Sequence, residues 1–420
     1  MSGLFCGIDI GTTNLKVLLL DEDGNTVWVK SVPAPRLHDG VGLVTDARAL
    51  VTLCEDLIIE GWRQTAQGRI ITAISTGGIG EDGVGTDATL APLGHAIQWN
   101  DRRGEVFAEA LASTEMARAH PTILLDFSSS VGKWAWLHQH RPADLAGAAQ
   151  WLTMTDYPLA LWSGVPFMSA TLAPRTGAFD LFKRQWIPEF LAWCSAPPLP
   201  PLKEAGEIVG RLRVGRLTSA GVASPETLLV AGGHDHPVAA SAIRRIATNA
   251  RIDSMGTANA TYGETAALAP DHPMEGLYAT LPISGAAGAA VIGMTEFSVT
   301  LDRLSGGVAE LYQKILKSND IKDLHTPFRA ALEALSSRTK DFWAAMTRAG
   351  VPQAPIFATG GWARAPALMQ LRANIFGAPI TVVDEPELVA LGAALFAAQG
   401  ATGHAPLFSA AGKSHVVEPR

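Results

Sequence analysis

The first thirty residues alternate between apolar runs and short polar turns. Apolar runs with strand propensity occupy residues 4–10 and 15–20, and residues 26–32 alternate between apolar and polar side chains. The connections Gly11-Thr12-Thr13-Asn14 and Glu22-Asp23-Gly24-Asn25 are typical of turns. The chain is therefore predicted to open as a strand–turn–strand–turn–strand meander. Neither a P-loop nor a dinucleotide fingerprint is expected here, because both require a strand followed by a helix.

Beyond the meander, predicted helices alternate with predicted strands, which is typical of an α/β protein. The helical pattern is clear at residues 47–64, where four apolar side chains lie on one side. A second half begins near residue 230. Further helical stretches are expected at residues 103–119, 133–139, 238–247, 365–376 and 386–398, and further strands at 69–75, 227–231 and 356–359.

Composition and charge narrow the class of protein. With 420 residues, the chain suggests two or three domains, and 47% hydrophobic against 17% charged residues is enough for a large core. The net charge of -7 argues against a nucleic-acid or anionic membrane surface. There is no apolar run of spanning length and no secretory leader at the start, and the three scattered cysteines do not predict disulfides. We expect a soluble cytoplasmic protein with a small-molecule partner. These observations leave open whether the protein forms a homodimer.

The first turn carries candidate phosphate-binding chemistry. Gly11-Thr12-Thr13-Asn14 offers a flexible backbone, two hydroxyl groups and several N–H groups between paired strands. Such a turn can wrap phosphate oxygens, and Lys16 adds a positive charge. Asp9 could hold a hydrated Mg²⁺ ion. Taken alone, the motif is more readily explained as an ordinary hairpin.

A candidate catalytic carboxylate follows the strand at residues 227–231. Asp235 lies in Gly232-Gly233-His234-Asp235-His236-Pro237. Carboxylates at the carboxyl ends of strands face the ligand crevice in α/β folds, where an Asp can accept a proton from an attacking hydroxyl. Two alternatives stay open. His234 and His236 could ligate a metal together with Asp235, or Asp235 could simply cap the helix that follows.

Three further clusters are ambiguous when each is taken alone. Gly360-Gly361-Trp362 follows a strand and lets a flat ligand or phosphate approach the backbone, although a tight turn explains it equally well. Trp99-Asn100-Asp101-Arg102-Arg103 suits a polyhydroxylated ligand, and Glu81-Asp82 could serve the same purpose. Surface charge is the ordinary explanation for such polar runs. Residues 252–259 echo residues 8–14, and both segments read as strand–polar turn–strand.

The order of these motifs resembles the FGGY family of carbohydrate kinases, within the actin/hexokinase/Hsp70 ATPase fold. The resemblance runs from about residue 5 to about residue 399. It rests on the first phosphate motif at 7–16, the sugar-contacting segment 99–103, the pattern from Ser128 to His140, the base motif 232–235, the second phosphate motif Met255-Gly256-Thr257, and the adenosine motif formed by 359–364 and 387–394.

The resemblance implies a fold class and a set of site residues. The fold is α/β, with two ribonuclease-H-like domains over residues 1–230 and 231–420, each a mixed β-sheet flanked by helices, and the active site in the cleft between them. Asp235 would act as the base and Asp9 would position Mg²⁺ through water. The residues implied for ATP are Gly11, Thr12, Thr13, Asn14, Lys16, Gly256, Thr257, Gly360, Gly361 and Trp362; those implied for the substrate are Glu81, Trp99, Asp101 and Asp235.

The activity implied by the resemblance is transfer of the γ-phosphoryl group of ATP to a hydroxyl of a pentulose, hexulose or polyol. Glu81 falls where pentulose kinases usually carry His and where glycerol kinases carry a substrate-binding Glu, and the region of residues 264–356 is shorter than in most of the family. One alternative is a catalytically silent relative with a regulatory role. Another is a chaperone-like or actin-like ATPase, which would have no use for the segment at residues 99–103.

Overall fold

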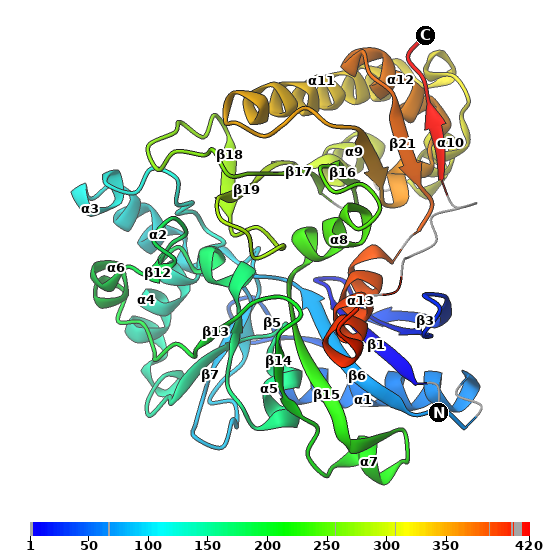
Figure 1. Cartoon of the computed structure of the whole chain (residues 1–420). Coiled ribbons are helices and arrows are strands. Elements are labelled where there is room, and N and C mark those ends of the chain that lie inside the picture. The colour runs from blue at the N-terminus through cyan, green and yellow to red at the C-terminus, as the bar shows by residue number, and fades with distance from the viewer. Residues whose placement is uncertain are drawn as a thin grey trace. The chain divides into compact units, whose positions relative to one another are not determined.

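The chain folds into two compact units, which are described separately. The computed structural model describes residues 3–420 except 66–67, 257, 307, 386, 405 and 407–413. The first unit comprises Met1–Ala242, Thr280–Ala286 and Leu388–Phe408; the second comprises Ile243–Ala279, Ala287–Glu387 and Ser409–Arg420 (Figure 1). The boundary predicted at residue 230 differs from this division, because strand β15 (Ala223–His234) belongs to the first sheet and helix α8 (Asp235–Arg244) follows it directly.

A six-stranded mixed sheet forms the centre of the first unit, with the order β14-β15-β6-β1-β2-β3. The predicted opening meander is confirmed, because β1, β2 and β3 pair antiparallel in sequence. Strand β6 runs parallel to β1 on one side and to β15 on the other. The bounds are Leu4–Ile10 for β1, Asn14–Leu20 for β2, Thr26–Pro33 for β3, Ile71–Gly78 for β6 and Ile208–Arg211 for β14.

Two long helices pack on this sheet. Helix α1 (Ala47–Thr65) contacts β2 and β3 through its apolar side, and α13 (Leu388–Thr402) contacts β1, β2, β6 and β15. A Cβ atom on Gly7 would overlap the carbonyl oxygen of Ala390 and lie 2.5 Å from the nitrogen of Ala394. Only glycine therefore permits β1 and α13 to approach this closely.

A lateral extension of the first unit carries a five-stranded sheet, with the order β4-β5-β8-β7-β9, and several short helices. The strands are β4 (Arg36–His38), β5 (Leu43–Thr45), β7 (Gly83–Thr86), β8 (Ala96–Ile97) and β9 (Gln150–Thr153). The helices of this part are η1 (Arg102–Gly104), α2 (Glu105–Ala112), α3 (Glu115–Arg118), α4 (Ser130–His140), η2 (Pro142–Asp144), η3 (Ala170–Thr176) and α6 (Pro188–Trp193). Two further short helices, α5 (Tyr157–Ser163) and α7 (Arg216–Ser219), pack on α1 and the central sheet. Short strands complete the unit at Met168–Ser169, Phe179–Asp180, Gln185–Trp186 and Leu202–Lys203.

The helical stretch predicted over residues 103–119 is interrupted. The hydroxyl of Thr114 accepts a hydrogen bond from the backbone nitrogen of Ala117 at 3.2 Å and caps a new helix, α3. A threonine that caps a helix start ends the continuity of the preceding pattern. Across all the residues described, no helix has both the length and the apolar character needed to cross a membrane.

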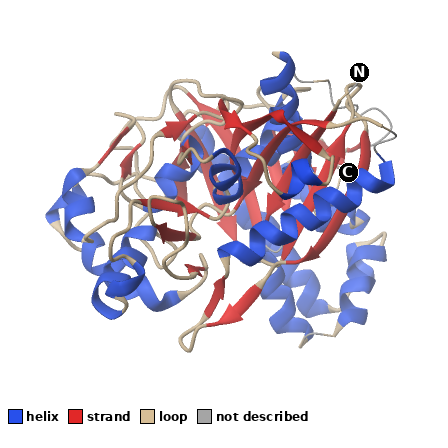
Figure 2. Ribbon diagram, turned by 90° about the horizontal axis from the view of Figure 1, so that it is seen from below, coloured by secondary structure: helices blue, strands red, loops and turns tan. Residues whose placement is uncertain are grey.

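The second unit is built on a seven-stranded mixed sheet, with the order β18-β19-β17-β16-β20-β21-β22. Its strands are Arg251–Met255 (β16), Asn259–Thr265 (β17), Leu277–Thr280 (β18), Ala289–Thr295 (β19), Ile356–Thr359 (β20), Ile380–Val383 (β21) and Ser414–Val417 (β22). Its helices are Phe297–Ser305 (α9), Ala309–Lys317 (α10), Ile321–Asp323 (η4), Thr326–Arg348 (α11), Gly361–Arg364 (η5) and Pro366–Phe376 (α12). The elements can be followed by type in Figure 2.

A buried polar network lies inside the second unit. Arg372 and Asp253 form an ion pair, and both side chains are fully buried, with 0% exposure. Asn259 donates to Asp253 Oδ1 at 2.6 Å and accepts from Arg372 Nη2 at 2.9 Å. Thr339 Oγ1 donates to the same Asn259 oxygen at 2.9 Å. The network ties β16 and β17 to helices α11 and α12.

Candidate active site

Three neighbouring parallel strands of the first unit end at one edge of the sheet. In the register of β1, β6 and β15, Ile10 lies beside Gly78, and Gly78 lies beside His234. The residues that follow these positions begin the first phosphate turn, the segment leading to Glu81, and the segment with Asp235. Carboxyl ends of parallel strands are where α/β folds bind ligands, so the topology gathers three of the predicted motifs at one place.

The first phosphate turn is compact and carries a charge pair beside it. The Gly11 N–H donates to the carbonyl oxygen of Asn14 at 3.1 Å. Asp9 and Lys16 are direct cross-strand partners in β1 and β2, and Lys16 Nζ lies 3.1 Å from Asp9 Oδ2. Asp9 is nearly buried, with 5% exposure. The turn thus has backbone N–H groups, two hydroxyls, an ammonium group and a carboxylate within a few residues.

Trp99 lies against the phosphate turn, although 87 residues separate the two in the sequence. Its indole N–H donates to the Thr12 hydroxyl at 2.7 Å. On the other side, the Trp99 ring lies 6.3 Å from the Phe127 ring, centroid to centroid. The bond links the segment predicted to contact the sugar with the segment predicted to contact phosphate.

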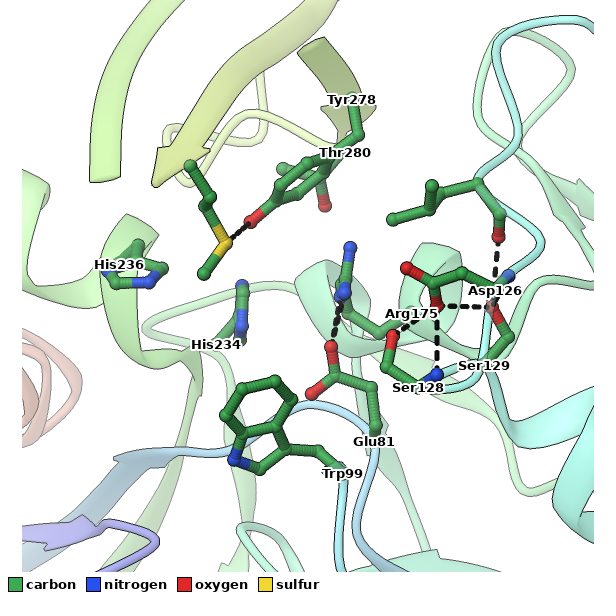
Figure 3. A network of polar contacts seen from close by, with 12 residues as sticks. Glu81, Trp99, Asp126, Ser128, Ser129, Arg175, His234, His236, Tyr278 and Thr280 are labelled. Atoms are coloured by element: carbon green, nitrogen blue, oxygen red, sulfur yellow. Dashed lines mark hydrogen bonds and ion pairs between the residues drawn. The ribbon is translucent and has the colours of Figure 1, made fainter. Parts of the chain in front are cut away.

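Glu81 is held by two cations from different elements, and Figure 3 shows one of them, Arg175. Arg175 on η3 donates from Nε to Glu81 Oε1 at 2.6 Å, and a second guanidinium nitrogen also contacts that oxygen. Lys133 on α4, which is fully buried, donates from Nζ to the Glu81 carbonyl oxygen at 3.0 Å. Both the carboxylate and the backbone of Glu81 are therefore fixed in place.

Burial and charge set the ionisation of this cluster. Burial alone would raise the pKa of Glu81, but interactions with Arg175, His234 and Lys133, led by the charge of Arg175, outweigh it, so the pKa is lowered and the carboxylate stays ionised. The neighbouring Asp82 has a pKa raised to about 7, chiefly by burial. Burial also lowers the pKa of Lys133, although nearby carboxylates oppose the shift.

Asp235 begins helix α8 at the end of β15, with an imidazole on each side. The backbone N–H of His236 donates to Asp235 Oδ1 at 2.6 Å, and His234 Nε2 lies 3.2 Å from the same oxygen. Burial alone would raise the pKa of Asp235; the two histidines and the His236 N–H outweigh it and lower that pKa. Burial lowers the pKa of His234 to about 4, so this ring is neutral near pH 7.

The alternative metal site at His234, Asp235 and His236 does not have the required arrangement. Among the described residues, which include these three, no group of three or more His, Cys, Asp and Glu side chains is placed so that it could hold a metal ion. The helix-cap alternative is met in part, because Asp235 is the first residue of α8 and its carboxylate accepts a hydrogen bond from the backbone N–H of His236.

Asp101, predicted as a substrate ligand, is engaged by its neighbour Arg103. Asp101 Oδ1 accepts from the Arg103 backbone N–H at 2.8 Å and from its Nε at 2.9 Å, while Oδ2 accepts from Nη2 at 2.7 Å. Arg103 also donates to Asp39, which accepts a further bond from Arg141 at 2.7 Å. Within these contacts, Asp101 orders the segment that carries Trp99.

The second unit presents the other predicted nucleotide residues. Gly360 has φ +94°, and a Cβ there would lie 2.5 Å from the Met255 carbonyl oxygen, so this position requires glycine. A Cβ on Gly361 would meet nothing within 4 Å. The Gly256 N–H donates to the Ala258 carbonyl oxygen at 3.0 Å and closes the second turn. Thr257 lies outside the described residues.

Trp362 is linked to that second turn through one serine. Its indole N–H donates to the Ser298 hydroxyl at 3.0 Å, and Ser298 donates to the Gly256 carbonyl oxygen at 3.1 Å. The Trp362 ring packs beside Phe297 and Tyr312, with centroid distances of 5.7 and 5.5 Å. The adenosine motif and the second phosphate motif are thus joined within one unit.

Sequence reasoning missed two side chains of the first-unit site. Arg175 lies in a 3₁₀ segment containing Pro174, which has no helical or strand pattern, and its partner Glu81 is 94 residues away. Lys133 lies inside the pattern from Ser128 to His140, which does not indicate that its side chain contacts Glu81. The sequence carries no signal for either contact, because the burial that makes each cation require a counter-charge is visible only in the structure.

The two mixed α/β units and their motifs define a class of fold that solved carbohydrate kinases share. The structure resembles a xyloylose kinase from Brucella ovis with a TM-score of 0.85 and 19% identity, covering 99% of this chain and 95% of that one. It resembles the xylulose kinase from Rhodospirillum rubrum with a TM-score of 0.84 and 21% identity, covering 99% and 94%. At these identities, the likeness establishes the fold.

Sequence comparison establishes the family. Residues 4–242 match the N-terminal domain of the FGGY family of carbohydrate kinases, and residues 311–401 match its C-terminal domain. The chain belongs to the FGGY family of carbohydrate kinases and is a phosphotransferase. It is 26% identical to a xylulose kinase of Streptomyces coelicolor over 441 residues, and 27% identical to a glycerol kinase of Gloeobacter violaceus over 448 residues; each match covers 95% of this chain and 88% of the relative.

Proposed function

We propose that this protein transfers the γ-phosphoryl group of ATP to a hydroxyl of a small, uncharged sugar or polyol. The observation that carries the proposal is the convergence of the phosphate turn, Glu81 and Asp235 at the ends of three adjacent parallel strands. The relatives at 26–27% identity are a xylulose kinase and a glycerol kinase, which together suggest a pentulose or a polyol.

Asp235 is the proposed general base. Its lowered pKa keeps the carboxylate ionised near pH 7, where it can accept a proton. In the proposed step, the substrate hydroxyl gives its proton to Asp235 and its oxygen bonds to the γ-phosphorus. The bond from that phosphorus to the bridging oxygen breaks, and ADP leaves with the electron pair.

The phosphate turn is the proposed site for the transferring phosphoryl group. Gly11-Thr12-Thr13-Asn14 and Lys16 would donate to phosphate oxygens, and Gly256, Gly360 and Gly361 of the second unit would accommodate the rest of ATP. Asp9 fits a Mg²⁺ role, because such ions bind through one or two carboxylates, several waters and the phosphates. When bound, Mg²⁺ neutralises charge on the phosphates; Asp9 would hold its water shell, while Lys16 steadies the Asp9 carboxylate.

Glu81 and Trp99 are the proposed substrate contacts. The ionised Glu81 would accept hydrogen bonds from sugar hydroxyls, and the Trp99 ring offers an apolar face to the carbon skeleton. Asp101 would contribute through its bonds with Arg103, which order the Trp99 segment. The alternative of a catalytically silent relative predicts binding without turnover.

A coupled ADP-release screen over pentuloses, hexuloses, aldoses and polyols tests the proposal. Wild-type protein should turn over at least one neutral substrate, and Asp235→Asn should lower kcat by about 10²–10⁴-fold with little change in the KM for ATP. Asp384→Asn, at an exposed position in the second unit, is the matched control. Turnover of Asp235→Asn above about a tenth of the wild-type rate would rule out the base assignment. Binding of a sugar with no ADP release would favour the silent alternative.

A further inference from the structure

Helix η3 supplies two contacts to the site from one short segment. Thr171 accepts the backbone N–H of His234 at 2.9 Å and so fixes the turn that carries Asp235. Four residues later, Arg175 pairs with Glu81. Arg175 and Glu81 are only 8% and 5% exposed, so this is a buried ion pair and not a surface contact.

The residue before Glu81 makes room for this arginine. A Cβ atom on Gly80 would lie 2.7 Å from Arg175 Cγ and 3.1 Å from His234 Cδ2. Distances this short mean that a side chain at position 80 would displace the aliphatic part of Arg175. Gly80 and Arg175 therefore form one arrangement, in which the arginine stem covers the backbone beside Glu81.

The charge of Arg175 acts on three ionisable groups at this edge of the sheet. It lowers the pKa of Glu81 and of Asp235, and it also lowers that of the neutral His234. Figure 3 shows the guanidinium, the Glu81 carboxylate, the Trp99 ring and the His234 ring gathered around the same region. Arg175 is thus placed to influence both the substrate contact and the base.

We propose that Arg175 is a specificity-determining residue, which holds Glu81 as an ionised acceptor and makes the pair selective for a neutral substrate with adjacent oxygen atoms. A guanidinium has five N–H donors in one plane, so the pair presents donors beside an acceptor. Adjacent sugar oxygens match that pattern. This inference rests on the proposed function, since it defines the class of substrate.

Charge balance gives the proposal its selectivity. With Arg175 present, the pair has no net charge. Neither the negative charge of a sugar acid nor the positive charge of an amino sugar is therefore attracted to it. Removal of one partner takes away the main counter-charge of the other, which is buried, and a complementary charge on the ligand then becomes favourable. A purely structural arginine would affect stability without changing which ligands bind.

The test compares Arg175→Gln, Arg175→Lys and Glu81→Gln with the wild type. Arg184→Gln is the matched control, because Arg184 pairs with Glu204 at the surface of the same unit. Sugar binding is measured by calorimetry without ATP, and turnover is measured by ADP release from about pH 5 to pH 9. Thermal unfolding checks that each variant is folded; if Arg175→Gln does not fold, the other two variants still decide the result.

Three results are expected. Arg175→Gln should lower kcat/KM for the neutral sugar by about 10–100-fold, with recovery as the pH rises, because Glu81 loses its counter-charge and its pKa rises. Arg175→Lys should lower kcat/KM for the neutral sugar less than Arg175→Gln does, and its pH profile should match that of the wild type. Glu81→Gln should raise binding of the corresponding sugar acid relative to the neutral sugar by at least about tenfold, because Arg175 then no longer faces the Glu81 carboxylate.

The failure of this inference can be distinguished from failure of the proposed function. If the wild type turns over a neutral sugar but the variants show only a uniform loss, with neither the pH shift nor the change in ligand preference, Arg175 is structural and the inference is wrong. If the wild type binds a sugar without turnover, the kinase proposal fails. The binding data still decide whether Arg175 determines which ligands bind. If the wild type binds no sugar, both are overturned.

Discussion

Replacement of Arg372 by methionine should strongly destabilise the second unit. The Arg372–Asp253 pair is fully buried, and the guanidinium also donates to Asn259 and lies near the rings of Phe297 and Phe376. Methionine keeps most of the aliphatic volume but leaves Asp253 as an unpaired buried charge. Loss of one partner of a buried ion pair costs about 3–5 kcal/mol. For a domain of 150 residues or more, this corresponds to a fall in Tm of roughly 6–20 °C.

Differential scanning calorimetry of the variant gives the measurement. Arg364→Met is the control, because Arg364 and Asp384 form an exposed pair at 2.9 Å in the same unit, and its loss should cost under about 1 kcal/mol. The double variant Arg372→Met with Asp253→Asn should regain part of the loss, since the uncompensated charge is then removed. The reasoning would be refuted if Arg372→Met lowered Tm no more than Arg364→Met does. It would also be refuted if the double variant lost more stability than the two single variants lose when their losses are added.

Two other predictions concern the first unit. His234→Leu should lower kcat about tenfold, because His234 Nε2 lies 3.2 Å from Asp235 Oδ1. His236→Leu should change kcat less than about threefold, because His236 Nε2 lies farther from the same oxygen, at 3.9 Å. Equal effects of the two substitutions in a steady-state assay would contradict this prediction. Burial raises the pKa of Asp82 from 3.8 to about 7, so its contribution to stability is complete below pH ~4 and is lost as the pH rises through 7. Asp82→Asn should therefore show a smaller fall in Tm than the wild type between about pH 5 and pH 8, and parallel curves would exclude this role for Asp82.

Elements with a strong local pattern could be predicted from the sequence. The opening meander, helix α1 and strand β20 are confirmed because their apolar periodicity, turn residues and length all agree. The helical stretch at residues 103–119 has the right composition, but Thr114 caps a second helix inside it. A capping interaction depends on the backbone angles of one residue, and composition averaged over a stretch does not record it.

The limits of sequence reasoning are clearest where two similar segments do different things. Residues 252–259 echo residues 8–14, and both form strand–turn–strand, as predicted. Asp9 lies opposite Lys16, while Asp253 lies opposite Thr261 and pairs with Arg372, which is 119 residues away. The echo predicts the local backbone. It does not predict the partner, because the partner comes from a distant helix. The pairing of Glu81 with Arg175 could not be predicted for the same reason.

The close packing of α13 on β1 has a consequence for how the protein is made. Strand β1 is synthesised well before helix α13, which covers Gly7 and begins only at residue 388. Until then, the parts of β1, β2, β6 and β15 that pack on α13 lack this helix. A chain that has been synthesised only as far as residue 242 therefore lacks α13, and a truncation before residue 388 removes the buried side chains that α13 contributes to the core of the first unit.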